Sequence, residues 1–245
     1  MTSSTKIAIF DYGAGNLFSL KSALERNGAE KVDIIYDMDS LDKYDGLVLP
    51  GVGNFDPAIK SIEKGAKNLG AAIERGMPVM GICLGMEMLF NRSEEGKREG
   101  LKILDGDVVM LPKGKVKVPH MGWNNLKITK EGKSKSRFLK GVKDDSWAYF
   151  VHSYKTAPAD KKLVVASSDY GTTVPAVVEK GNLIGVQFHP EKSGDVGARM
   201  IKNFLLMCRG GEGREGDGEG EERQQQQQKK QKQAKPQKKG DGRKK

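Results

Sequence analysis

Cys83 lies in the segment MPVMGICLGMEML (residues 77–89), between Gly81 and Gly85, after an apolar run and before a segment of helical character. A strand that ends just before the cysteine and a helix that begins just after it would place the thiol on a tight turn, which the two glycines permit. This arrangement is typical of a nucleophile elbow, in which the helix N-terminus lowers the pKa of the thiol and the N–H of Leu84 points at an oxyanion. A small cysteine buried in the core explains the same residues equally well.

A thiolate nucleophile needs a histidine as general base, and that histidine needs an acceptor that orients it. The chain has three histidines, His120, His152 and His189. His189 ends an apolar strand, and Glu191 follows two residues later, where its carboxylate can reach back to the imidazole. We therefore expect a catalytic triad of Cys83, His189 and Glu191, and we expect the other two histidines to be non-catalytic.

The first half of the chain alternates short β-rich runs with helical stretches, which predicts a parallel sheet covered on both faces. The predicted strands are 6–10, 32–36, 46–50 and 78–82, and the predicted helices are 17–28, 56–76 and 84–93. The second half is richer in β signal, with six such stretches between residues 107 and 189, and ends in a helix at 196–208. We expect an α/β fold, a three-layer sandwich with a mixed, largely parallel sheet.

The composition changes sharply near residue 208, so we expect one folded domain at 1–208 and a separate tail at 209–245. The tail has no Val, Leu, Ile, Phe, Met, Trp or Tyr and carries 12 Lys/Arg against 7 Asp/Glu. Such a segment buries too little apolar surface to offset the entropy of ordering, so we expect it to be disordered. It is either a solvated extension or a basic arm for RNA or another polyanion. Without aromatic residues, such an arm would bind regardless of sequence.

Several functional classes are excluded by what the sequence lacks. Two cysteines, Cys83 and Cys208, make no disulfide framework, and three histidines make no His-rich metal site. The start of the sequence has no apolar stretch of signal length, and no segment reaches the ~20 apolar residues of a membrane helix. We expect a cytoplasmic protein with no membrane contact, no metal and no cofactor.

Six segments occur in an order that resembles the class I, or triad-type, glutamine amidotransferases: FDYGAGNL, LPGVGNF, GICLGM, PHMGWN, YFVHSY and GVQFHPEKSG. GICLG and HPE mark the superfamily. PGVGNF, HMGWN and HPEKSG are similar to the glutaminase subunit of imidazole glycerol phosphate synthase in particular. The resemblance runs from about residue 6 to residue 206, which is nearly all of the predicted domain.

The resemblance implies hydrolysis of glutamine to glutamate and ammonia through a glutamyl thioester on Cys83. The backbone N–H groups of Leu84 and Val52 would form the oxyanion hole. Gly51 and Gly53 flank Val52, which fits a backbone segment that changes conformation. Because a preformed hole would waste glutamine when no acceptor is present, we expect low basal activity that rises when a partner docks.

The resemblance also places Gly51, Gly53, Ser153 and Tyr154 at the glutamine pocket. Glu87 departs from the family pattern, in which most members have Gln. At four residues from Cys83 it would lie on the same helical face. A carboxylate there would disfavour the thiolate, but it could hold the α-ammonium group of glutamine by a charge-assisted hydrogen bond.

The implied partner is a cyclase with the fold of a (β/α)8 barrel, which would form a heterodimer with this chain. It would use the ammonia to make imidazole glycerol phosphate and the aminoimidazole carboxamide ribotide of histidine biosynthesis. By resemblance, Asn16, Trp123 and Lys192 belong to the interface. Without the resemblance, Trp123 is an ordinary half-buried aromatic residue and Lys192 a solvated lysine.

Other functions are compatible with part of the sequence. The chain could serve another ammonia-using synthase or be a cysteine hydrolase with a similar elbow, although HMGWN and PGVGNF argue against both. It could also be a silent binding subunit that its basic tail tethers to nucleic acid. The intact set of Cys83, His189 and Glu191 argues against that alternative. A dinucleotide-binding loop at DYGAGNLF is disfavoured because Phe18 stands where a third small residue is needed.

Overall fold

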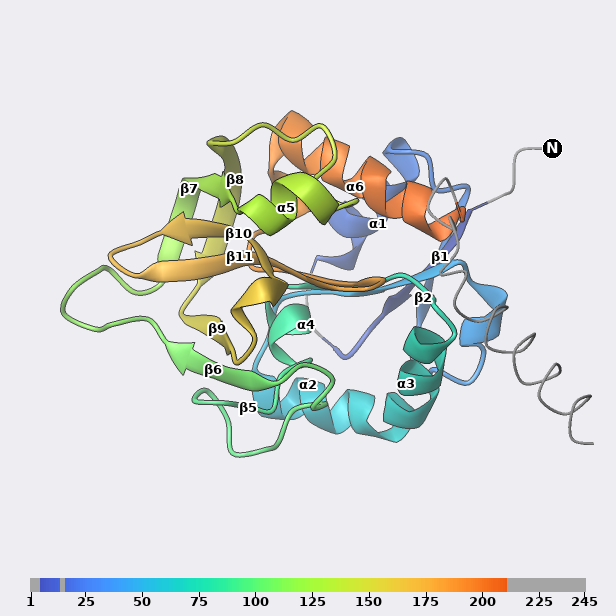
Figure 1. The fold of residues 1–245 in the computed structure, drawn as a ribbon. Helices are drawn as coiled ribbons and strands as arrows, with labels where there is room; N and C mark the ends of the chain where they lie inside the picture. The colour runs from blue at the N-terminus through green and yellow to red at the C-terminus, as the bar shows by residue number, and fades with distance from the viewer. Residues whose placement is uncertain (1–4, 14–15, 211–245) are drawn as a thin grey trace, which may run out of the picture. The chain divides into compact units, whose positions relative to one another are not determined.

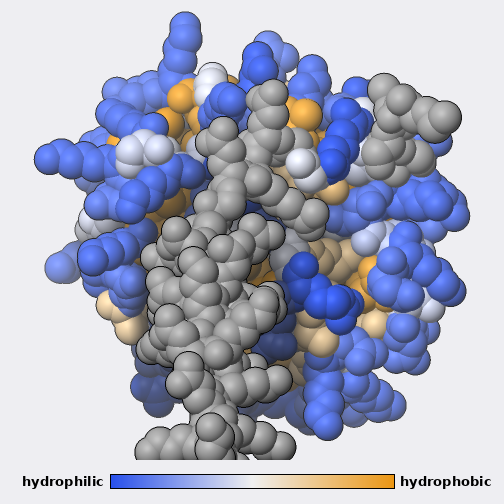
Figure 2. Space-filling model, turned by 45° about the vertical axis from the view of Figure 1, so that its right-hand side comes forward, coloured by the Kyte–Doolittle hydropathy of each residue, from blue (hydrophilic) through white to orange (hydrophobic). Residues whose placement is uncertain are grey.

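The computed structural model describes residues 5–13 and 16–210 of the chain. The predicted tail at 209–245 therefore lies outside the described residues, apart from its first two. No helix in the described ranges is both long and apolar enough to span a membrane. On the face drawn in Figure 2, hydrophilic side chains predominate and hydrophobic residues form small, separate patches.

A nine-stranded mixed sheet forms the centre of the fold, in the order β2-β1-β3-β4-β12-β11-β10-β7-β8. The strands β2, β1, β3, β4 and β12 pair in parallel, and the remaining pairs are antiparallel. The bounds are β1 Lys6–Phe10, β2 Lys31–Ile35, β3 Gly46–Leu49, β4 Val79–Ile82, β7 His120–Ile128, β8 Ser146–His152, β10 Val164–Asp169, β11 Thr173–Lys180 and β12 Leu183–Val186.

Helices cover both faces of the sheet (Figure 1). One face packs against α1 and α6, and the opposite face packs against α2 and α3. Their bounds are α1 Leu17–Arg26, α2 Phe55–Ile62, α3 Ala66–Glu74 and α6 Gly194–Cys208. A hydrophobic core lies on each face of the sheet, and alternate residues of β1 belong to different cores. Ile7 and Ile9 face α1 and α6, while Ala8 and Phe10 face α2 and α3. The predicted three-layer α/β fold with a mixed sheet is confirmed.

A smaller sheet of β5 (Arg92–Ser93), β6 (Gly106–Met110) and β9 (Tyr154–Pro158) accompanies the large one. No pattern in the sequence indicated β9. A short helix, α5 (Lys130–Lys135), precedes β8 and is likewise an element that the sequence pattern did not indicate.

Two predicted helices differ in the structure. The helix expected at 56–76 is two helices separated by a 3₁₀ turn at Glu63–Gly65, where a Cβ on Gly65 would lie 2.9 Å from the Met38 side chain. The helix expected at 84–93 is only α4, Leu84–Glu87. The carbonyls that would continue it, those of Met88, Leu89 and Phe90, instead accept N–H groups from residues 101–104. In this segment, backbone hydrogen bonds to a distant part of the chain take the place of the hydrogen bonds that would extend the helix.

The turn after β4 packs against neighbouring backbone so closely that it depends on glycine. A Cβ on Gly85 would lie 2.1 Å from the carbonyl oxygen of Leu49, and one on Gly81 would lie 2.6 Å from the carbonyl oxygen of Gly85. Both neighbours are backbone oxygens, one in β3 and one in α4, and neither can move aside as the end of a flexible side chain can. The expectation that these two glycines permit a tight turn is confirmed.

Substitution of Gly85 by Ala should therefore destabilise the fold by about 3 kcal/mol, because the added methyl group overpacks a rigid backbone. Gly70→Ala is the matched control: this residue is inside α3, and nothing lies within 4 Å of the place that its Cβ would take. That variant should be stabilised by up to about 1 kcal/mol through helix propensity. Urea unfolding of both variants measures the difference, and equal stabilities would contradict the packing argument.

Candidate active site

The register of two parallel strands brings the predicted nucleophile and base to one edge of the sheet. Strands β4 and β12 are neighbours, with Ile82 paired to Val186, and the backbone N–H of Cys83 donates to the carbonyl of Val186 at 2.6 Å. Cys83 follows β4, and His189 follows β12. Ligands and catalytic groups of open α/β sheets lie at these carboxyl ends.

Cys83 occupies a strained backbone conformation between β4 and α4. Its φ of 49° and ψ of −108° lie in a region that non-glycine residues rarely adopt. The carbonyl of Cys83 accepts the N–H groups of Met86 and Glu87, which starts the short helix. The thiol is 3.8 Å from the carbonyl oxygen of Val151 and 3.7 Å from the amide nitrogen of Gln187. This is the geometry of a nucleophile elbow.

The electrostatics of the thiol differ from expectation. Burial, and after it the negative charge of Glu87, raise the pKa of Cys83 above its ordinary value, while the Leu84 N–H and the Gln187 amide oppose this. The expected lowering by the helix N-terminus is therefore wrong for the site as it stands. A helix of four residues has a small dipole, and desolvation outweighs it.

His189 and Glu191 form a buried pair on the turn that follows β12. The Nδ1 of His189 lies 2.9 Å from Oε1 of Glu191, and the imidazole is only 2% exposed. Since a carboxylate only accepts, Nδ1 carries the proton, and Nε2 has no hydrogen-bond partner among the described residues. The carboxylate is near enough to Cys83 for its charge to raise the pKa of the thiol. The three predicted triad residues thus share one region.

A pocket of about 320 Å³ opens onto the thiol. It contains every residue predicted for glutamine binding and for the oxyanion hole. Its lining residues are Gly51, Val52, Gly53, Cys83, Leu84, Glu87, Glu95, Pro119, Val151, His152, Ser153 and Tyr154. Of these, Glu95, Pro119 and Val151 were not predicted to line it. They come from the loop after β5, the residue before β7 and strand β8, and no sequence spacing indicates that these segments meet.

Two carboxyl groups, those of Glu87 and Glu95, line the pocket. Glu87 is 4% exposed and accepts a hydrogen bond from the Gln187 amide at 3.2 Å. Burial raises the pKa of Glu87 to about 7, and the charge of Glu95 adds to that effect. Burial also raises the pKa of Glu95. A positively charged group in the pocket would relieve both carboxylates, which suits the ammonium end of an amino acid.

The other two histidines form a hydrogen-bonded pair, and His152 of this pair lines the pocket. His152 Nδ1 donates to the carbonyl of Tyr154 at 2.7 Å, so its Nε2 accepts from His120 Nδ1 at 2.9 Å. His120 is stacked between the rings of Phe150 and Tyr170 at centroid distances of 4.8 and 3.9 Å. Burial lowers the pKa of His120 to about 4 and that of His152 to about 3. With both nitrogens of His152 engaged, its role here is structural.

The residues predicted for the interface lie at the surface. The ring of Trp123 is 52% exposed and meets Tyr149 edge-on at 5.9 Å, and the Lys192 ammonium lies 6.0 Å from the centroid of the same Tyr149 ring. The structure therefore brings two of the three predicted residues onto one aromatic residue. Asn16 is exposed and caps α1, where its side chain accepts the Ser19 N–H at 3.1 Å.

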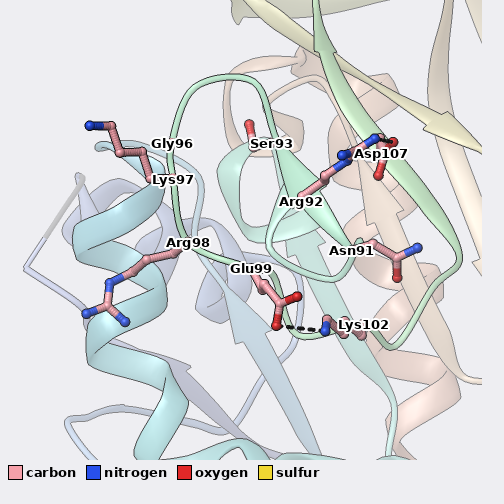
Figure 3. Close-up of a pocket in the computed structure, with 9 residues that line it drawn as sticks. All are labelled: Asn91, Arg92, Ser93, Gly96, Lys97, Arg98, Glu99, Lys102 and Asp107. Atoms are coloured by element: carbon pink, nitrogen blue, oxygen red, sulfur yellow. Dashed lines mark hydrogen bonds and ion pairs between the residues drawn. The ribbon is translucent and has the colours of Figure 1, made fainter.

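A second pocket, of about 570 Å³, is larger but chemically unpromising (Figure 3). Its charged side chains are mostly paired with one another or with neighbours: Arg92 with Asp107 at 2.9 Å, Lys102 with Glu99 at 2.7 Å, and Arg98 with Glu63 at 2.8 Å. It contains no thiol or imidazole. In the described ranges, no group of three or more His, Cys, Asp or Glu side chains could hold a metal ion.

Comparison with known families agrees with this site. The family described as glutamine amidotransferase class-I matches residues 8–208. The chain belongs to this family. The match begins in β1 and ends at the last residue of α6, so it spans the elbow, the histidine–glutamate pair and the pocket of this amidotransferase.

Curated relatives of this amidotransferase carry the name imidazole glycerol phosphate synthase subunit HisH. The protein from Caldanaerobacter subterraneus subsp. tengcongensis is 47% identical over 206 residues, covering 83% of this chain and 98% of the relative. The Halobacterium salinarum protein is 46% identical over 210 residues, covering 82% and 93%. The Geobacillus kaustophilus protein is 46% identical over 212 residues, covering 83% and 98%.

Solved structures share the fold of this amidotransferase at low sequence identity. PurLQS from Thermotoga maritima matches with a TM-score of 0.64 at 22% identity, covering 82% of this chain and 98% of that one. A glutamine amidotransferase from the same organism matches with a TM-score of 0.62 at 14% identity, covering 84% and 98%. These likenesses support the fold assignment only.

The buried histidine pair should make the stability of this amidotransferase depend on pH. Both folded pKa values lie below the ordinary 6.5, so the unfolded chain binds protons first as the pH falls. Stability contributed by the neutral pair is therefore complete above pH 6.5 and is lost toward pH 4, by up to about 1.4 kcal/mol per pH unit for each histidine.

His120→Phe removes one of these titrations and keeps an aromatic ring in the stack. Between about pH 6 and pH 5, its unfolding free energy should depend on pH less steeply than that of the wild type, by about 1.4 kcal/mol per unit. Urea unfolding at each pH measures both slopes. Ionisable groups that do not contact His120 cancel in the comparison, and the folded pKa of His152, about 3, lies well below this pH range. Parallel slopes would refute the assignment of a lowered pKa to His120.

Proposed function

We propose that this chain is the glutaminase subunit of an imidazole glycerol phosphate synthase, and that it hydrolyses glutamine to glutamate and ammonia for histidine biosynthesis. One observation carries the proposal above all. A cysteine on a strained elbow faces a pocket of amino-acid size, with a buried histidine–glutamate pair at the same sheet edge. The HisH relatives, matched over 93–98% of their length, support the choice of synthase.

In the proposed mechanism, Nε2 of His189 takes the proton of the Cys83 thiol while Glu191 holds Nδ1. The thiolate attacks the side-chain carbonyl carbon of glutamine, and a C–S bond forms. The C–N bond then breaks as His189 returns the proton to the departing nitrogen, which leaves as ammonia. Water attacks the resulting thioester, again with His189 as base, and releases glutamate with the thiol restored.

The oxyanion of each tetrahedral intermediate would be bound by the backbone N–H groups of Leu84 and Val52. Both residues line the pocket beside the thiol. Gly51 and Gly53 flank Val52, and Gly53 has a φ of 127°, so this segment has backbone freedom that other residues lack. We propose that docking of the partner sets its conformation and thereby raises a low basal activity.

Glutamine would be held by its amino-acid end. We assign the α-ammonium group to Glu87, with Glu95 as a second carboxylate in the same pocket, and the rest of the amino-acid end to the backbone of Gly51, Gly53, Ser153 and Tyr154. The α-ammonium group would neutralise charge next to the thiol. Binding of substrate would then favour the thiolate that attacks it.

The partner would be a cyclase with the fold of a (β/α)8 barrel, which forms a heterodimer with this chain and takes up the ammonia. Trp123 and Lys192, which meet on Tyr149, form the proposed contact together with Asn16. In this proposal residues 1–208 are the glutaminase domain, working in the reducing cytoplasm, and residues 209–245 add no catalytic group.

The full-length chain should release glutamate slowly by itself and at least about tenfold faster in complex with the cyclase, because docking completes the oxyanion hole. Glutamate release, measured enzymatically with and without the cyclase, checks this, and ammonia transfer to the ribotide is followed in the same complex. Cys83→Ala should remove glutamate release in both settings and leave co-purification with the cyclase intact. A wild-type complex that releases no glutamate would instead support a silent binding protein.

Glu87→Gln should raise the KM for glutamine about tenfold in the complex, because a charge-assisted hydrogen bond to the α-ammonium becomes a neutral one. Glu74→Gln is the matched control, since it removes an exposed carboxylate at the end of α3. Steady-state kinetics of glutamate release give both KM values. A KM for Glu87→Gln equal to that of the control would remove Glu87 from the substrate site.

A further inference from the structure

We propose that Gln187 is a positioning residue of this active site, whose amide nitrogen holds the Cys83 sulfur and the Glu87 carboxylate on its two N–H groups. The inference rests on the proposed function in taking Cys83 as the nucleophile. Gln187 had no part in the predicted site, and it lies between the last residue of β12 and the histidine. It is completely buried, and its backbone N–H donates to the carbonyl of Ala176 at 3.0 Å.

The contacts of the amide define its orientation. The Nε2 atom is 3.7 Å from the sulfur of Cys83 and 3.2 Å from Oε1 of Glu87, while Oε1 of Gln187 has no partner among the described residues. An amide nitrogen has two N–H groups, and here it has two acceptors. Rotation of the amide by half a turn would place its oxygen against a carboxylate and a sulfur. Chemistry therefore selects the orientation with nitrogen toward both.

The two acceptors conflict when both are ionised. Glu87 follows Cys83 by one helical turn, both are buried, and the Glu87 charge raises the pKa of the thiol. Two like charges in a poorly solvated site disfavour each other unless a donor lies between them. Gln187 is that donor, and its hydrogen bonds lower the pKa of both Cys83 and Glu87. It allows Glu87 to keep a charge for substrate while the thiol remains ionisable.

Other ionisable groups also face this pair. Glu95, from the loop after β5, raises the pKa of Glu87, and Glu191, from the turn after β12, raises that of Cys83. Tyr12, from the segment after β1, and Tyr154, from β9, are also close enough to be affected by the Glu87 charge. Among the side chains that the structure describes, Gln187 is the one that donates a hydrogen bond to the sulfur.

The test is the pH profile of Cys83 alkylation by iodoacetamide, measured on the full-length chain in complex with the cyclase. Peptide mass spectrometry separates Cys83 from Cys208. Gln187→Met keeps the length of the side chain and removes both N–H groups, so the midpoint should move up by about one pH unit, and the alkylation rate at about pH 7.5 then falls about tenfold. Glu87→Gln should move the midpoint down, since the opposing charge is gone.

The two substitutions should not be additive, because the amide separates the sulfur from the very charge that Glu87→Gln removes. The shift caused by Gln187→Met should therefore be smaller in the double variant. A structural role alone would lower the thermal midpoint of Gln187→Met and leave the alkylation midpoint unchanged, which would overturn the proposal. If Gln187→Met does not fold, the test rests on Glu87→Gln. An alkylation midpoint of Cys83 that is unchanged or raised in that variant would show that the Glu87 charge does not oppose the thiolate, and this would overturn the proposal.

Alkylation does not require glutamine turnover. Loss of glutamate release in the wild-type complex would refute the proposed function, whereas an unshifted alkylation midpoint would refute only the role of Gln187. The two failures are therefore distinguishable in one set of samples.

Discussion

The parallel pairing of β4 with β12 is the constraint on which the site depends. Cys83 and His189 are far apart in the sequence, and neither strand carries a catalytic group within its own length. The register that pairs Ile82 with Val186 makes both strands end together, so the segments that follow them, with Cys83 and His189, lie at the same end of the sheet. The bond from the Cys83 N–H to Val186 fixes the elbow to the neighbouring strand. A slip by one residue in this register would separate thiol and imidazole.

Burial, rather than the dipole of the short helix α4, determines the pKa values in this site. Desolvation raises the pKa of the thiol, of Glu87 and of Glu95, and lowers that of the two structural histidines. The interior therefore favours neutral forms throughout. In the proposed function, charge is introduced locally, by hydrogen bonds and by the substrate's own ammonium group. Binding of glutamine would then be coupled to ionisation of the nucleophile.

The sequence predicted the fold class, most elements to within two or three residues, and a set of site residues that the structure gathers in one region. These depend on local pattern: apolar alternation, glycines around Cys83, and a histidine at a strand end. Gln187 and Glu95 could not be found in this way, since each matters through what distant segments place beside it. The shortening of the helix after Cys83 has the same cause, because its carbonyls bond residues 101–104. The prediction of a lowered thiol pKa failed because burial, which the local pattern does not reveal, raises the pKa of Cys83.

Tyr149 connects the surface residues Trp123 and Lys192 with the buried His189. Its ring meets Trp123 and lies under Lys192, while its backbone carbonyl accepts the N–H of His189 at 2.9 Å. Its own N–H donates to the Ser193 hydroxyl at 3.0 Å, and that hydroxyl donates to the carbonyl of His189 at 2.7 Å. The proposed base, His189, is thus hydrogen-bonded to the main chain of a residue whose ring lies beside the exposed Trp123 and Lys192. A partner that docks there as proposed would be separated from the imidazole by a single residue.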